Sequence, residues 1–305
     1  MRRILGRSAA LAALLLLVST SVAEAQGKGR GLGRGKNKGT ATASPTNPGG
    51  GDDPAAEAGL DIPGSGVRQF GAWLDDASIQ ERGRGWVGVS VGYWRSTYGH
   101  QWDAPSLDAG VGVHPRVQLA LSAPVSRISF DDGTGSRGLG DVYLTTKVGL
   151  VDPDVPGRNW GLAVAPVLEV LNSRSVVEGQ ERVYWALPLT FERRFEGFRA
   201  YGSAGYFSRG AVFGSGALEI PVSHRVTTLV AMTHSRSREE DPLSDALELS
   251  PTRTDISAGA MYAVTDAATV YATLGRTISR LDENGTSLAA TAGVSFGFER
   301  WFQNR

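Results

Sequence analysis

Two histidine neighbourhoods are the places where this sequence could carry out hydrolytic chemistry. His234 is followed by Ser235, Arg236 and Ser237, and His100 lies near Asp103. A histidine base must reach its nucleophile by a hydrogen bond. On a β-strand, residues two apart share a face, so both serines fall on the face opposite His234. Barrel proteases use Asp and His residues at the outer rim, which His100 and Asp103 could imitate, but two residues of such common types in one loop are weak evidence. The sequence therefore predicts no enzyme and no catalytic residue.

Composition narrows the chemistry further. The 305 residues contain no cysteine, which excludes disulfides, thiolate metal sites and thiol catalysis. Four histidines leave little material for a metal site, and 31 basic residues balance 31 acidic ones. Nothing in this charge balance favours a nucleic-acid partner. We therefore expect no cofactor, no metal ion and no nucleic acid.

Ionisable and tyrosine side chains recur instead on one face of a series of predicted strands. The candidates for lining an enclosed polar interior are Asp141, Tyr143, Lys147, Glu169, Arg182, Tyr184, Glu192 and Arg199. Counting through the predicted hairpins places Asp141 near the level of Glu169, and Glu169 near Tyr184 and Arg182. Such a cluster would narrow a pore and set its charge selectivity. Alternatively, it would only hold the wall in register through charge-assisted hydrogen bonds, which is the reading that we favour.

A second charged pair belongs to the opposite end of the same strands. Glu192 and Arg199 flank the predicted turn at Glu196 and Gly197, so we expect a local ion pair there.

The strands that must position these residues are indicated by a hydrophobic period of two. Val87, Val89 and Val91, for example, alternate with small or polar residues, as in a β-strand with two different faces. The pattern recurs and predicts twelve antiparallel strands. They span residues 86–94, 107–113, 117–125, 142–150, 162–170, 183–191, 198–206, 211–222, 226–234, 256–264, 268–278 and 288–298.

The connections and the two faces of these strands indicate how they assemble. Tight turns alternate with longer loops, with the short connection at residues 207–210 as the exception. This is the layout of an outer-membrane barrel with both termini on the short-turn, periplasmic side. One face is rich in Val, Leu, Ala, Ile and Phe, and the other in Gly, Ser, Thr and Tyr. Lipid offers no water to the backbone, so the sheet must close. The fold class predicted is all-β: a transmembrane outer-membrane β-barrel over residues 85–302, apolar outside and polar inside.

The residues before the barrel divide into two segments. Arg2, Arg3 and Arg7 precede an apolar run over residues 9–18, and a small-residue cleavage pattern follows at residues 23–25. Residues 1–25 are therefore predicted to be a signal peptide. Residues 26–84 begin rich in Gly, Lys and Arg and are predicted to form a disordered or weakly ordered periplasmic arm. A solvated linker is the preferred reading of the arm, and contact with anionic lipid or cell-wall polymer is the alternative.

The segment from Gly138 to Lys147, GLGDVYLTTK, carries a resemblance to a known family. It resembles the G-hydrophobic-G-D-x-x-L-x-x-K segment of the outer-membrane barrel family named for the meta-cleavage pathway of phenol degradation. The resemblance covers residues 85–302 and implies a channel for small, often aromatic or otherwise hydrophobic, molecules. The chain departs from outer-membrane barrels in general because Phe302 is followed by three further residues rather than ending the chain.

Together these observations predict a porin-like passive pore or transporter for small solutes in the cell outer membrane. Twelve strands predict a narrow lumen, since eight leave an interior filled by side chains and sixteen leave a wide channel. The expected partners are outer-membrane lipid, a small-molecule solute and the barrel assembly machinery. The alternative is a structural or ligand-binding barrel that transports nothing because its lumen is plugged.

Overall fold

The computed structural model describes residues 74–97, 99–171, 182–208, 210–238, 250–279, 281 and 285–298. It also gives the backbone of three two-residue strands, β1 (Val22–Ala23), β2 (Arg68–Gln69) and β3 (Ala72–Trp73). Apart from these strands, the predicted signal peptide and residues 26–73 of the predicted arm lie outside the described residues, as do residues 299–302.

The long strands follow in sequence order. They are β4 (Gly85–Arg95), β5 (Gly99–His114), β6 (Val117–Phe130), β7 (Gly135–Leu139), β8 (Val142–Val151), β9 (Trp160–Val164), β10 (Val167–Val170), β11 (Val183–Phe195), β12 (Phe198–Phe207), β13 (Ala211–Pro221), β14 (Val226–Ser237), β15 (Thr252–Thr265), β16 (Ala268–Thr277) and β17 (Leu288–Phe298).

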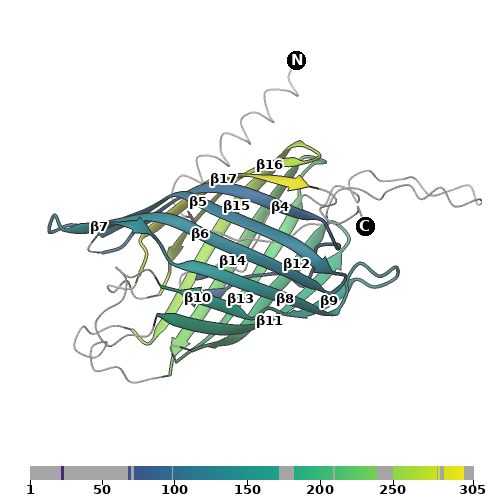
Figure 1. Ribbon diagram of the computed structural model, residues 1–305, viewed down its shortest axis with the longest axis horizontal. Coiled ribbons are helices and arrows are strands. Elements are labelled where there is room, and N and C mark those ends of the chain that lie inside the picture. Colours follow the sequence, from purple (N-terminus) through teal and green to yellow (C-terminus); the bar gives the residue numbers. More distant parts are fainter. Residues whose placement is uncertain are drawn as a thin grey trace, which may run out of the picture.

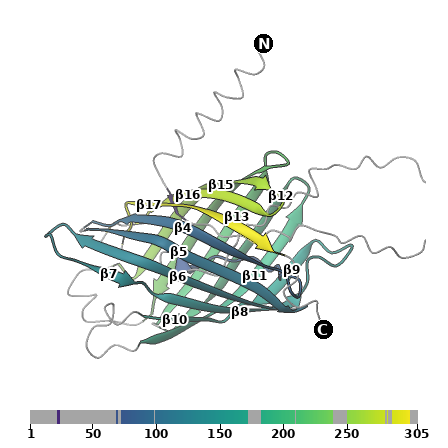
Figure 2. The same ribbon diagram turned by 45° about the horizontal axis from the view of Figure 1, so that its top comes forward.

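These strands form one closed antiparallel barrel (Figures 1 and 2). Each strand from β11 to β17 pairs with the next, and β17 pairs with β4 along its whole length, from Phe298 opposite Gly85 to Leu288 opposite Arg95. Two positions of the barrel are each filled by two successive strands, at least one of which is short. β7 and β8 both pair with β6, while β9 and β10 both lie between β8 and β11. The barrel therefore has twelve strand positions, which confirms the predicted number.

The predicted strand over residues 162–170 is interrupted in the structure at Ala165 and Pro166. Proline has no N–H to donate to a neighbouring strand, so it is tolerated only where the ladder is irregular. The wall stays bonded across the break, because the Thr146 N–H donates to the Pro166 carbonyl at 2.9 Å and the Ala165 N–H donates to the Pro188 carbonyl at 2.9 Å. β9 and β10 therefore act as one strand of the wall.

The two rims of the barrel differ as the sequence predicted. The rim that holds the start of β4 and the end of β17 also holds the tight turns, including the two-residue turn between Phe195 and Phe198. Gly197 has a φ of 81° in that turn, a conformation that disfavours other residues. We call this end of the barrel the short-turn end. The opposite rim holds the long connections between β10 and β11, β14 and β15, and β16 and β17, and is called the long-loop end. The connection between β4 and β5, predicted to be a longer loop, has only three residues, as does the connection between β12 and β13.

Burial separates the two faces of the long wall strands, as β4 illustrates. Val87, Val89 and Val91 are 40–44% exposed on the outside, whereas Ser90 between them is 3% exposed. Polar side chains such as Gln118 and Thr190 are almost fully buried inside. The arrangement reverses that of a water-soluble barrel and confirms the predicted apolar exterior and polar interior.

Within the described part of the chain, no helix is both long and apolar enough to cross a membrane.

Candidate functional site

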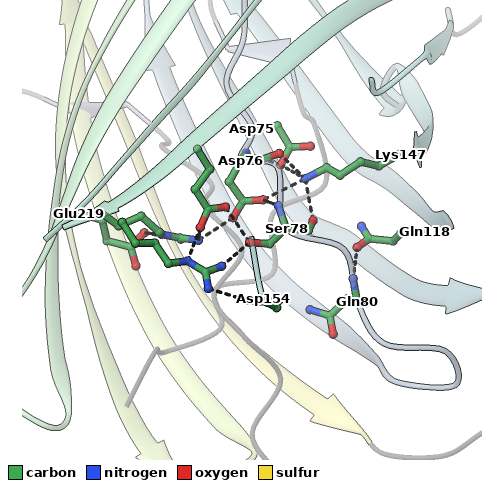
Figure 3. A network of polar contacts seen from close by, with 11 residues as sticks. Asp75, Asp76, Ser78, Gln80, Gln118, Lys147, Asp154 and Glu219 are labelled. Atoms are coloured by element: carbon green, nitrogen blue, oxygen red, sulfur yellow. Dashed lines mark hydrogen bonds and ion pairs between the residues drawn. The ribbon is translucent and has the colours of Figure 1, made fainter. Parts of the chain in front are cut away.

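The barrel interior is occupied near the short-turn end by residues 74–84, which we call the inner segment. Leu74 and Ala77 are fully buried, and Asp75 and Asp76 are at most 1% exposed. Leu74 packs against residues of β12, β13 and β14, including Tyr201. The sequence interpretation had assigned residues 74–84 to the end of the weakly ordered arm. In the structure they run through the lumen just before β4 begins (Figure 3).

The other end of the inner segment is bonded to the opposite part of the wall. The Gln80 N–H donates to Gln118 Oε1 on β6 at 3.1 Å. The Gly83 N–H donates to the Gly112 carbonyl on β5 at 2.7 Å, and the Gly112 N–H donates to the Arg84 carbonyl at 2.9 Å. A Cβ built on Gly112 would lie only 2.2 Å from the Gln80 carbonyl oxygen, so this close approach requires glycine. The inner segment therefore crosses the lumen from β12–β14 to β5 and β6.

Lys147 on β8 is the central attachment of the inner segment. Its Nζ lies 2.7 Å from Asp75 Oδ1, 3.0 Å from Asp76 Oδ1 and 2.8 Å from the Asp76 carbonyl oxygen. The lysine side chain is completely buried. Figure 3 shows its ammonium group directed at Asp75 and Asp76. A buried ammonium is costly unless it is paired and hydrogen-bonded, and these three oxygens meet that requirement.

Arg199 on β12 attaches the inner segment from the other side. Its Nη1 lies 2.9 Å from Asp76 Oδ2, so Asp76 bridges β8 and β12. The Arg199 guanidinium also donates to Glu219 through Nε at 3.0 Å and lies 3.6 Å from Glu192 Oε1. The expected ion pair between Glu192 and Arg199 is therefore present, but it belongs to a larger network that the sequence did not predict.

Ser78 extends this network along β11. Its hydroxyl donates to Glu192 Oε2 at 2.7 Å and accepts from Arg194 Nη2 at 3.1 Å. Arg194 also pairs with Glu192 at 2.6 Å and with Asp154 at 2.5 Å at the short-turn rim. Charged groups of β8, β11 and β12 thus hold the inner segment. Further ion pairs connect them to Glu219 on β13 and to Asp154 in the turn after β8.

The long-loop half of the lumen carries a different group of residues. Tyr143 on β8 and Tyr184 on β11 are the direct neighbours of Glu169 on β10. The Tyr143 hydroxyl donates to Glu169 Oε1 at 3.1 Å, and Glu169 is 1% exposed. The two tyrosines pack against an inward apolar cluster that contains Phe207 and Phe213. An aromatic wall and a buried carboxylate therefore lie side by side in this half.

The structure brings the predicted lumen candidates together in two groups rather than one. Lys147, Glu192 and Arg199 meet the inner segment, while Tyr143, Glu169 and Tyr184 meet one another. Asp141 is half-buried and lies directly before β8, the strand that holds Tyr143, and Arg182 is exposed directly before β11. Their predicted part in a constriction stays a prediction.

Sequence reasoning missed Asp75, Asp76 and Ser78. Two features of the sequence could have indicated them. Two acidic residues directly follow Trp73 and Leu74, and Lys147 on the predicted inward face needs a negatively charged partner. Charges inside a barrel need partners, and the predicted strands alone supplied none for this lysine.

His234, and the Asp103 neighbour of His100, form hydrogen bonds with other residues of the wall. His234 is exposed, with Nδ1 2.8 Å from Thr254 Oγ1. The Asp103 carboxylate accepts hydrogen bonds from Ser126 Oγ at 2.5 Å and Gln101 Nε2 at 2.9 Å.

No family model and no curated protein matches this sequence. Among solved structures, an outer membrane channel from Pseudomonas putida F1 is similar over 73% of this chain and 98% of its own, with a TM-score of 0.55 and 13% identity. The NanC porin is similar over 69% of this chain and 98% of its own, with a TM-score of 0.51 and 10% identity. The similarity at these identities is one of fold. The chain therefore has the twelve-stranded fold of an outer-membrane β-barrel.

Proposed function

We propose that this protein is a passive pore for small solutes in the cell outer membrane. The observation that carries the proposal is a closed barrel with an apolar exterior and a lumen lined by charged and hydroxyl side chains. Backbone closure and the apolar face suit lipid, while a lumen of this polarity suits water and polar solutes. The similarity in fold to an outer membrane channel and to a porin supports the same reading.

The long-loop half of the lumen suggests the class of solute. Tyr143 and Tyr184, which are partly buried, face inward beside the Glu169 carboxylate and pack against the buried rings of Phe207 and Phe213. Aromatic rings pack favourably against other rings, and a carboxylate attracts cationic or hydrogen-bonding groups. We therefore propose small solutes with a hydrophobic or aromatic part, which agrees with the resemblance to the barrel family of the meta-cleavage pathway.

The inner segment favours one alternative, a barrel that transports nothing. Its residues fill part of the lumen at the short-turn end and are bonded to several strands. A segment held in this way would narrow a pore, or would close it if the remaining space were too small for a hydrated solute.

Single-channel recording of the refolded full-length protein in planar bilayers tests the proposal. A pore predicts discrete conductance steps, and proteoliposomes should admit small aromatic solutes faster than sugars of similar mass. A barrel that shifts on unheated gels as folded protein does, but gives no steps, would contradict the proposal and support the plugged alternative.

A further inference from the structure

The outward face of the barrel has a basic groove near the long-loop end. The groove, of about 490 Å³, is lined by residues of β5, β6 and β7, among them Trp102, Arg127, Ser129 and Arg137. Arg127 shares the outward side of β6 with Leu119 and Leu121, which are 42% and 40% exposed. The groove therefore opens on the same side as the lipid-facing residues, where β6 and β7 project past the neighbouring strands (Figures 1 and 2).

The two arginines of the groove are direct cross-strand partners. Arg127 on β6 lies opposite Arg137 on β7, and both side chains are exposed. Two exposed guanidinium groups directly opposite each other concentrate positive charge on this part of the surface, which attracts anions. Guanidinium groups bind phosphate oxygens in a bidentate manner, which makes a phosphate a suitable anion.

The height of these arginines matches the edge of a bilayer. Arg127 lies ten residues beyond Val117, where β6 starts at the short-turn end. At about 3.4 Å per residue and a tilt of about 45°, this distance is roughly 24 Å, close to the ~25 Å apolar band of such barrels. Arg236 on β14 and Arg276 on β16 face outward at similar heights. The groove is thus part of a basic girdle at the long-loop interface.

Aromatic side chains lie at the same height on the barrel wall as these arginines. Trp102, which lies opposite Arg127, is 43% exposed and packs on Tyr93 with a ring-centroid distance of 4.8 Å. Trp and Tyr prefer the boundary between hydrocarbon and headgroups. A ligand here would meet phosphate-binding groups above and apolar side chains, including Leu121, below.

We propose that this groove binds a phosphorylated glycolipid of the outer leaflet. Arg127 and Arg137 hold a headgroup phosphate, Ser129 adds a hydroxyl, and the acyl chains lie along the apolar face of β5 and β6. The inference depends on insertion with the long-loop end outward and not on the passage of solute, so it stands apart from the proposed function.

Native mass spectrometry of the full-length protein with bisphosphorylated lipid A and with its dephosphorylated form tests the proposal. The Arg127→Gln/Arg137→Gln variant should bind the phosphorylated lipid about tenfold more weakly than the unchanged protein, because two charge-assisted contacts are lost. The matched control is Arg193→Gln, an exposed arginine near the short-turn rim whose guanidinium lies over Phe195. It should bind the lipid as the unchanged protein does.

A second lipid, a competing anion and a second double variant complete the test. The dephosphorylated lipid should bind the unchanged protein about tenfold more weakly, and millimolar inorganic phosphate should not displace the phosphorylated lipid. Arg127→Lys/Arg137→Lys keeps the charges without the planar fork and should bind less tightly, even if the glutamine variant does not fold. Equal binding of both lipids, undiminished binding by the glutamine variant, or displacement by free phosphate would each overturn the proposal.

Discussion

Lys147 shows at the scale of single residues why the lumen needs the inner segment. Its ammonium group is completely buried, and the oxygens around it come from Asp75, Asp76 and Ser78. The sequence predicted that this lysine faces inward, because its position in the alternation is readable from the strand alone. Its partners were not predictable, since they lie about seventy residues earlier in a segment without a strand pattern.

Removing the lysine charge should destabilise the barrel strongly. Lys147→Met leaves two buried carboxylates without their main cation, a loss of about 3–5 kcal/mol in the free energy of unfolding. Urea unfolding in lipid vesicles measures it. Arg193→Gln, at an exposed position, should change the value by no more than about 0.5 kcal/mol. A cost below about 1 kcal/mol for Lys147→Met would show that the ion pairs do not hold the inner segment.

The carboxylates of the long-loop half give a second prediction. If Asp141 and Glu169 line the solute path, Asp141→Asn with Glu169→Gln should lower the permeability of cations relative to anions, because the path loses negative charge. Reversal potentials in a salt gradient measure this ratio. Unchanged selectivity together with lower heat resistance would mean that the two residues only hold the wall together.

Among the elements, the strands and the inner segment differ in how well the sequence predicts them. The strands follow from a period of two, and the twelve positions of the barrel match the twelve predicted strands. The interruption at Pro166 was missed because apolar residues continue on both sides of it. The inner segment has no periodicity, and its place depends on ion pairs between distant residues such as Asp76 and Arg199.

Weakening the attachment of the inner segment should widen the pore. Asp75→Asn with Asp76→Asn removes the carboxylate partners of Lys147 and Arg199, so the segment should leave the lumen part of the time. We expect larger conductance steps than in the unchanged protein, recorded in planar bilayers.

Asp266→Asn provides the matched control for this change. Asp266 is exposed in the turn between β15 and β16 at the short-turn end and belongs neither to the inner segment nor to the charged network described above. Its conductance should equal that of the unchanged protein. If the double variant also keeps the unchanged conductance while remaining folded, the inner segment does not limit the pore.

The whole molecule has its apolar side chains outside and its polar side chains inside, the reverse of a water-soluble barrel. The proposed function requires that solute passes along the polar inner side of the wall. Neighbouring residues on β13 illustrate the two environments. Ser215 is half-buried on the inward side, and its hydroxyl lies 2.8 Å from Ser203 Oγ, whereas Gly216 is exposed outside. Open space surrounds a Cβ built on Gly216, with its nearest contact at 3.9 Å. Because the chain lacks cysteine, a single cysteine at either position would be the only reactive thiol.

Single-channel conductance of Ser215→Cys and Gly216→Cys, before and after a charged, water-soluble methanethiosulfonate is added, tests the central claim most directly. If solute passes through the lumen, the reagent should reduce the conductance of Ser215→Cys and leave that of Gly216→Cys unchanged. Channels that are insensitive at Ser215→Cys but blocked at Gly216→Cys, or the absence of channels in either folded variant, would contradict the account.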